Sequence, residues 1–150
     1  MTTVHPPTGA ALNMTWQNAP THIIKAGGVN FAYRQLGPSS GVPVVFLTHL
    51  AAVLDNWDPG VVDGIAAQRR VITFDNRGVG ASSGATPTTI EEMARDAVTF
   101  IRALGFERVD LFGFSLGGMI AQVIAQQQPQ LVRKMIIAGT GPAGARASTR

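Results

Sequence analysis

Residues 109–117, Val-Asp-Leu-Phe-Gly-Phe-Ser-Leu-Gly, decide the fold of this chain. The apolar run at the start of this stretch predicts a buried strand, and the residues after Ser115, rich in Ala, Ile and Gln, predict a helix over 116–128. Gly113 and Gly117 lie two residues on either side of Ser115, so that a strand and a helix can approach each other closely. The pattern predicts a strand, a sharp turn that carries a serine, and a helix.

The pattern Gly-x-Ser-x-Gly occurs a second time, over residues 80–84. That copy lies several residues beyond the nearest strand-like run, and the Thr- and Pro-containing segment after it is typical of a loop and a helix cap. Only the copy at 113–117 has a strand before it and a helix after it, which is the context of a nucleophile on a strand-to-helix turn. We therefore assign Ser115 as the candidate nucleophile, and Ser82 and Ser83 to a polar turn.

Length and composition favour one globular domain. The chain has 150 residues, of which 45% are hydrophobic and 14% charged, enough to bury a core. We expect residues 1–19, rich in Pro, Thr and Asn, to form a loose N-terminal arm, and residues 20–150 to form the domain. The net charge of +3 comes from scattered basic residues rather than from a stripe, which argues against a nucleic-acid partner.

The sequence gives no sign of export or of a membrane. It has no cysteine, which excludes disulfides, thiol catalysis and cysteine-ligated metals. Its first residues lack a basic segment followed by an apolar one, and no apolar run approaches the roughly 18 residues that a membrane helix requires. We therefore expect a cytoplasmic protein without a membrane partner.

Apolar runs and turn signals predict strands that alternate with helices. Gly27-Gly28 separates two β-like runs at hairpin spacing. The alternation that follows the hairpin implies parallel strands in an α/β sheet. The predicted strands are 21–26, 29–34, 42–47, 70–74, 109–112 and 134–138, and the predicted helices begin at Pro59 with Asp58 as N-cap, at Ile90 and at Leu116.

The helix predicted over 90–104 has the clearest boundaries. Either Thr88 with Glu91 or Thr89 with Glu92 supplies a capping box at its start. A glycine at position 105 is expected to end it.

Four features occur in the order found in the α/β-hydrolase family, which the chain resembles from about residue 21 to residue 140. They are the strand that runs into His49, the Asp-x-Arg-Gly-x-Gly-x-Ser loop at 75–82, the capped helix, and the serine turn at 113–117. The segment Asn56-Trp57-Asp58 is similar to microbial esterases and cofactor-free haloperoxidases. The resemblance implies an α/β fold, with a mostly parallel sheet and flanking helices, of which this chain is the N-terminal portion.

The resemblance also implies roles for individual residues. Ser115 would be the catalytic nucleophile, and the backbone N–H groups of Leu116 and Ala51, or less favourably Leu50, would form the oxyanion hole. His49 would orient its loop rather than act as the base, because the histidine of the triad comes late in the family's chains. The family commonly has Gly after this histidine, whereas this chain has Leu50, where a positive φ would be costly.

The loop at 75–82 has a structural interpretation. We expect Asp75 and Arg77 to fix it through hydrogen bonds and an ion pair. Gly78-Val79-Gly80 does not begin a dinucleotide fingerprint, because position 83 is Ser and no helix opens there. No His, Asp or Glu residues have metal-ligand spacing. We therefore expect neither a cofactor nor a metal.

Ser115 lacks its expected partners in this sequence. From Leu116 to Arg150 there is no His, Asp or Glu, whereas the acid and the histidine follow the nucleophile in this fold. The resemblance therefore implies a chain without the C-terminal strands, the cap, and the acid and histidine of the triad. Loss of the base lowers the rate of such enzymes by about 10⁴ to 10⁶.

These observations leave three functional hypotheses open. The first is hydrolysis of a carboxylic ester or related acyl bond through an acyl-Ser115 intermediate, if a missing C-terminal part completes the protein. The alternatives are a non-catalytic truncated or split fragment, and a cofactor-free haloperoxidase or perhydrolase. The expected partners are a small-molecule acyl substrate and, at the apolar edge strand 134–138, a second copy of the chain or a complementing C-terminal half.

Overall fold

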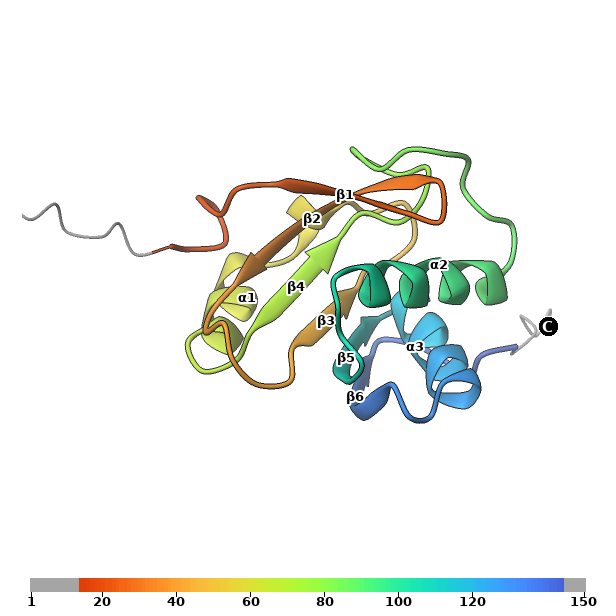
Figure 1. Ribbon diagram of the computed structural model, residues 1–150. Helices are drawn as coiled ribbons and strands as arrows, with labels where there is room; N and C mark the ends of the chain where they lie inside the picture. The colour runs from red at the N-terminus through yellow and green to blue at the C-terminus, as the bar shows by residue number, and fades with distance from the viewer. Residues whose placement is uncertain (1–13, 145–150) are drawn as a thin grey trace, which may run out of the picture.

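The computed structural model of the protein describes residues 14–144, which contain one mixed sheet. Its strands are β1 (His22–Ala26), β2 (Val29–Leu36), β3 (Val44–Leu47), β4 (Val71–Phe74), β5 (Val109–Phe114) and β6 (Val132–Ala138). They lie in the order β1-β2-β4-β3-β5-β6 (Figure 1). β3 to β6 pair in parallel, whereas β2 is antiparallel to both β1 and β4. The predicted fold class is confirmed.

Local sequence signals set the ends of the helices, which are α1 (Pro59–Ala66), α2 (Ile90–Ala103) and α3 (Leu116–Gln127). Asp58 caps α1, because its Oδ1 accepts a hydrogen bond from the N–H of Val61 at 3.1 Å. Of the two N-caps predicted for α2, the structure uses Thr89, whose Oγ1 accepts a hydrogen bond from the N–H of Glu92 at 3.2 Å. Gly105, at φ +88°, follows the end of α2 as predicted.

The helices cover the two faces of the sheet separately (Figure 1). Successive residues of a strand point to opposite faces, and β3 shows this division. Val45 and Leu47 pack with residues of α2 and α3, whereas Val44 and Phe46 pack with residues of α1. Each face of the central strands therefore has its own core, which explains why β3 reads as a continuous apolar run.

The N-terminal segment is packed where the structure describes it. Trp16 is 2% exposed, and its backbone N–H donates to Asp63 Oδ1 at 2.7 Å. The guanidinium of Arg34 lies over the Trp16 ring, 5.0 Å from its centroid, a cation–π arrangement. The expectation of a loose arm is thus wrong for residues 14–19, because an indole in a polar context still buries a large apolar area. Residues 1–13 lie outside the described part.

Candidate active site

Ser115 adopts a backbone conformation that L-amino acids rarely take. It lies between β5 and α3 with φ +52° and ψ −115°, which costs on the order of 1–3 kcal/mol for a residue with a side chain. Neighbours on both sides hold it there. Its N–H donates to the carbonyl of Ala138 at 3.0 Å, and its carbonyl accepts from Thr140 Oγ1 at 2.7 Å. The turn predicted from the sequence is therefore a strained turn held by β6 and the loop after it.

The glycines on either side of Ser115 lie where no side chain fits. A Cβ at Gly113 would come 2.5 Å from the carbonyl oxygen of Gly117, and a Cβ at Gly117 would overlap the carbonyl of Leu47. Both contacts are with backbone, which does not move aside as a flexible side chain does. The two glycines thus allow the start of α3 to lie against both β5 and β3.

The start of α3 presents backbone donors beside Ser115. The first N–H groups of a helix have no acceptor within the helix, and the helix dipole places partial positive charge there. Leu116 is the first residue of α3, and the hydroxyl of Ser115 makes no capping hydrogen bond with that helix. Ser115 is half-buried. A half-exposed hydroxyl beside free donors is the arrangement that an oxyanion-forming reaction requires.

The loop after β3 contains His49, Leu50 and Ala51. Ala51 has φ +56°, and within residues 14–144 it and Ser115 are the two non-glycine residues with positive φ. His49 Nδ1 lies 3.1 Å from the carbonyl oxygen of Leu50, and the His49 ring meets the Phe114 ring edge-on with centroids 5.7 Å apart. The strain foreseen at Leu50 falls instead on Ala51, and the Leu50 side chain is 71% exposed.

Asp75 ties this loop to the following one. Its Oδ1 accepts from the N–H of Leu54 at 2.6 Å, and its Oδ2 accepts from the N–H of Ala81 at 2.9 Å. Leu54 begins the short 3-10 helix η1 (Leu54–Asn56), which the sequence did not predict. Asp75 is 3% exposed, and within the described residues no Lys or Arg forms a salt bridge with it. Backbone N–H groups thus hold this buried carboxylate.

The second serine motif belongs to the same loop. Ser82 Oγ donates to the carbonyl of Asp75 at 2.7 Å and accepts from the N–H of Ala32 at 3.0 Å. Ser82 is buried, so its hydroxyl is engaged on both sides.

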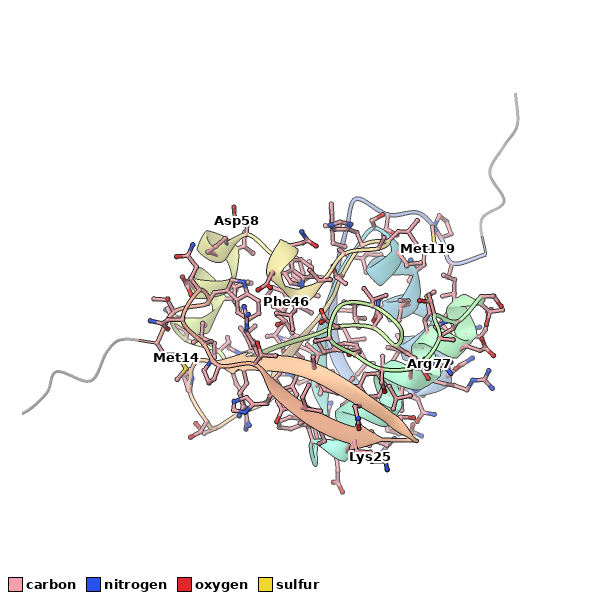
Figure 2. All side chains as sticks on the ribbon, turned by 90° about the horizontal axis from the view of Figure 1, so that it is seen from above. Met14, Lys25, Phe46, Asp58, Arg77 and Met119 are labelled. Carbon is pink, nitrogen blue, oxygen red and sulfur yellow. The ribbon has the colours of Figure 1, made fainter. Side chains whose placement is uncertain are left out.

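Arg77 connects its loop to α2 rather than to the serine turn. Its Nε donates to Asp96 Oδ2 of α2 at 2.8 Å, and Arg77 lies beside α2, away from Asp58 (Figure 2). Burial of Asp96 raises the pKa of its carboxyl, and the hydrogen bond and charge of Arg77 offset this only in part. The ion pair expected in this loop therefore joins it to α2.

A hollow of about 330 Å³ lies beside the turn, on the α1 side of the sheet. Phe112 and Trp57 both line it, with ring centroids 5.8 Å apart, and the Trp57 indole N–H is buried without a hydrogen-bond partner among the described residues. Its lining combines apolar and polar groups, namely Thr48, His49, Asn56, Trp57, Asp58, Val61, Phe112 and Phe114. Phe112 and Phe114 were not predicted as lining residues, although their alternation along β5 indicates a shared face.

The described part of the chain contains neither a candidate metal site nor a candidate membrane-spanning helix. Within residues 14–144, no group of three or more His, Asp or Glu side chains is placed to hold a metal ion. No helix in the same range is long and apolar enough to cross a membrane.

Two named proteins are similar to this chain in sequence. A Mycobacterium tuberculosis protein provisionally named non-heme bromoperoxidase BpoC is 35% identical over 113 residues, or 75% of this chain and 42% of that protein. The 3-oxoadipate enol-lactonase 1 of Acinetobacter baylyi is 33% identical over 85 residues, which are 57% of this chain and 32% of that enzyme.

A solved structure is also similar to this chain. An alpha/beta hydrolase fold protein from Chitinophaga pinensis superimposes with a TM-score of 0.83 at 46% identity, covering 84% of this chain and 46% of that one. The chain thus spans less than half the length of these relatives. The family profile described as alpha/beta hydrolase fold matches residues 42–147. With this match over more than half its length, and with a strained serine between β5 and α3, the chain belongs to the alpha/beta hydrolase fold family.

Proposed function

We propose that the protein is a serine hydrolase that cleaves a carboxylic ester or a related acyl bond through an acyl-Ser115 intermediate. The observation that carries this proposal is the conformation of Ser115. It is held at φ +52° at the start of α3, and its hydroxyl makes no capping hydrogen bond with that helix. A protein retains such strain where it serves function. The A. baylyi relative is named for the opening of a lactone, which is an internal ester.

The reaction has two steps. Ser115 Oγ attacks the carbonyl carbon, its proton passes to a base, and the alcohol leaves with that proton as the ester C–O bond breaks. Water then attacks the acyl-serine, and the carboxylic acid leaves while Ser115 regains its proton. In both steps the negative oxygen is stabilised by the backbone N–H groups of Leu116 and Ala51. The positive φ of Ala51 supports a special role for its loop.

The base and the acid that orients it come from a polypeptide segment outside this sequence. Residues 116–150 contain no His, Asp or Glu, and in this fold those groups follow the nucleophile. His49 is held at the carbonyl of Leu50 and against Phe114, which supports a role in ordering its loop. The present chain therefore supplies the nucleophile and the N–H donors of the oxyanion hole.

The hollow beside the turn favours a short apolar group as the part of the substrate it holds. Val61, Phe112 and Phe114 give it apolar walls, and its volume of about 330 Å³ is at the lower end of ligand pockets.

The test uses this chain fused to the part of the C. pinensis relative that it does not match. With p-nitrophenyl acetate, Ser115→Ala is expected to lower kcat by at least about 10⁴, and Ser40→Ala, at an exposed serine, is expected to leave it unchanged. A fluorophosphonate probe is expected to label Ser115 in the same fusion. An unchanged rate in Ser115→Ala would exclude an acyl-Ser115 mechanism, whereas a fusion that shows neither turnover nor labelling would leave a non-catalytic protein as the answer.

A second candidate is a perhydrolase, favoured by the name of the M. tuberculosis relative. Here hydrogen peroxide replaces water in the second step, so that acyl-Ser115 yields a peracid, which oxidises bromide to hypobromite. Acetate, peroxide and bromide supplied to the fusion measure this activity. Bromination that disappears in Ser115→Ala would establish it.

A further inference from the structure

Arg34 contacts three residues outside its own strand. It lies in β2, and because side chains alternate along a strand it shares a face with Leu36, which packs with residues of α1. Its Nε donates to Thr21 Oγ1 at 2.9 Å, and its Nη1 forms an ion pair with Asp55 Oδ1 at 2.6 Å. The same guanidinium lies over the Trp16 ring, 5.0 Å from the ring centroid. Both the edge and the face of this guanidinium are therefore engaged.

This set of contacts requires an arginine. A guanidinium is planar and donates in fixed directions while its face stacks on an aromatic ring, whereas a lysine ammonium is a point charge on a flexible stem. The ion pair itself contributes little to stability, because the Asp55 side chain is 66% exposed and water screens it. The Arg34 side chain is only 16% exposed. A well-held arginine on a weakly stabilising ion pair is better suited to fixing the position of Asp55 than to stabilising the fold.

Asp55 belongs to the segment that forms one wall of the hollow beside Ser115. It lies in η1, and both residues that follow it line the hollow. Asp75, which follows β4, holds the residue before it by accepting the N–H of Leu54 at 2.6 Å. Arg34 in β2 and the carboxylate after β4 thus hold adjacent residues of η1. The wall of the hollow depends on both.

Trp16 connects this contact to the N-terminal segment. Its ring is buried in one hydrophobic cluster with Leu54, and Trp57 packs against the same cluster. Its backbone N–H donates to Asp63 of α1 at 2.7 Å, which fixes the ring that Arg34 covers. Residues on both sides of β2 therefore keep the guanidinium in place.

From these contacts we propose that Arg34 is a positioning residue that holds η1 through Asp55 and thereby sets which acyl groups the hollow accepts. The acyl selectivity rests on the proposed function. A wall that is released enlarges the hollow and admits longer acyl groups, so Arg34 controls selection rather than the chemical step. Trp16 and Arg34 both precede residues 42–147, which the family profile matches. The segment before that match therefore contributes a determinant of substrate selection.

The first test measures acyl selectivity in the fusion of this chain with the unmatched part of the C. pinensis relative. Arg34→Met is expected to lower the ratio of kcat/KM for p-nitrophenyl acetate over p-nitrophenyl octanoate at least about tenfold, through KM rather than kcat. Asp55→Asn, at an exposed side chain, is expected to lower it in the same direction. The double variant is expected to match Arg34→Met, because the two residues act through one ion pair. Arg34→Lys is expected to restore only part of the ratio, because it lacks the stacked plane.

Arg70→Met is the matched control. Arg70 also lies over an aromatic ring, that of Phe106 at 4.8 Å, but its hydrogen bonds go to Gln35 and Ser39 rather than to η1. This variant is expected to leave the ratio unchanged, even if it lowers stability. An unchanged ratio in Arg34→Met, or an equal change in Arg70→Met, would overturn the proposal.

A second measurement needs no catalysis and uses this chain alone. Trp16→Phe retains an aromatic partner for the guanidinium and leaves Trp57 as the only tryptophan. In this background, Arg34→Met and Asp55→Asn are each expected to shift the fluorescence emission of Trp57 to longer wavelength, because a released η1 admits water to the indole. Arg70→Met is expected to leave the emission unchanged, and an unshifted emission in the first two variants would overturn the proposal. A fusion that hydrolyses neither ester would refute the proposed function, while the emission shift would still establish that Arg34 positions η1.

Discussion

Gly117 lies so close to Leu47 that a Cβ on the glycine would overlap the carbonyl of the leucine. Leu47 is the last residue of β3, and Gly117 is the second residue of α3. Their contact brings the start of the helix against the strand whose following loop contains Ala51. The two predicted oxyanion donors therefore depend on a space that only glycine leaves free.

Gly117→Ala is expected to lower the free energy of unfolding by about 3 kcal/mol, because the added methyl group meets the backbone of Leu47 across a packed interface. Gly64→Ala is the control, since a Cβ at Gly64 in α1 meets nothing within 4 Å. That substitution is expected to raise stability by about 0.5–1 kcal/mol. Urea unfolding of both variants measures the difference, and equal stabilities would contradict the packing argument.

Ser115→Gly is expected to be about 1 kcal/mol more stable than Ser115→Ala. Both lack the hydroxyl, but glycine accepts φ +52° without steric cost, and this gain exceeds its greater chain entropy in the unfolded state. Thermal unfolding of the two variants side by side isolates the backbone strain. A glycine variant less stable than the alanine variant would show that the turn is unstrained.

Asp75→Ala is expected to lower stability by about 2–5 kcal/mol, because it leaves the buried N–H of Leu54 and the part-buried N–H of Ala81 without their acceptor. Asp58→Ala removes one exposed N-cap bond and is expected to cost about 1 kcal/mol. Chemical denaturation of both variants gives the comparison. If the two costs were equal, Asp75 would not be the anchor of the loop after β3.

Asp110 predicts an acid-sensitive contribution to stability. It accepts hydrogen bonds from Arg69 at 2.7 Å and from Arg133 at 2.7 and 2.9 Å, and joins the start of β4 to β6. Burial by itself raises the pKa of Asp110, but hydrogen bonds from Arg133 and Arg69 and their charges outweigh it and lower the pKa below 3.8. The ionised carboxylate therefore stabilises the fold above pH 3.8, and this stabilisation is lost as the pH falls through the folded-state pKa.

Asp110→Asn is expected to lower stability at pH 7 by about 2 kcal/mol, less than for a fully buried pair because both arginines are partly exposed. The difference in stability between this variant and the wild type should disappear below pH 3.8. Asp96→Asn is the control with the opposite sign. Because the pKa of Asp96 is raised, the wild type gains stability relative to that variant as the pH falls toward 3.8. Urea midpoints from pH 2 to pH 7 record both trends, and parallel curves would contradict them.

Local signals were enough for most of the elements. Asp58 before Pro59 fixes the start of α1, and Gly105 ends α2, since caps act through hydrogen bonds between residues close in sequence. The ends of strands were less predictable. β6 begins at Val132 rather than Lys134, because its start is set by pairing with Val109, more than twenty residues away.

The active-site prediction divides in the same way. Ser115 and its glycines followed from one strand-turn-helix pattern, whereas the hollow lined by Trp57 and Phe114 joins segments far apart in sequence. The strain lies at Ala51 rather than at Leu50, in a loop that Asp75 fixes by accepting a hydrogen bond from the N–H of Leu54. No local pattern encodes that contact.

The sequence by itself determined that this chain is alpha/beta hydrolase-like and that Ser115 is its candidate nucleophile, because periodicity, caps and glycine spacing act over a few residues. Only the tertiary structure decided which backbone groups hold Ser115 in its strained conformation, which side chains form the hollow beside it, and which edge of the sheet is left unpaired. These depend on contacts between β3, β5, β6 and α3, and distances between segments remote in sequence are fixed only when the strands pair and the helix packs.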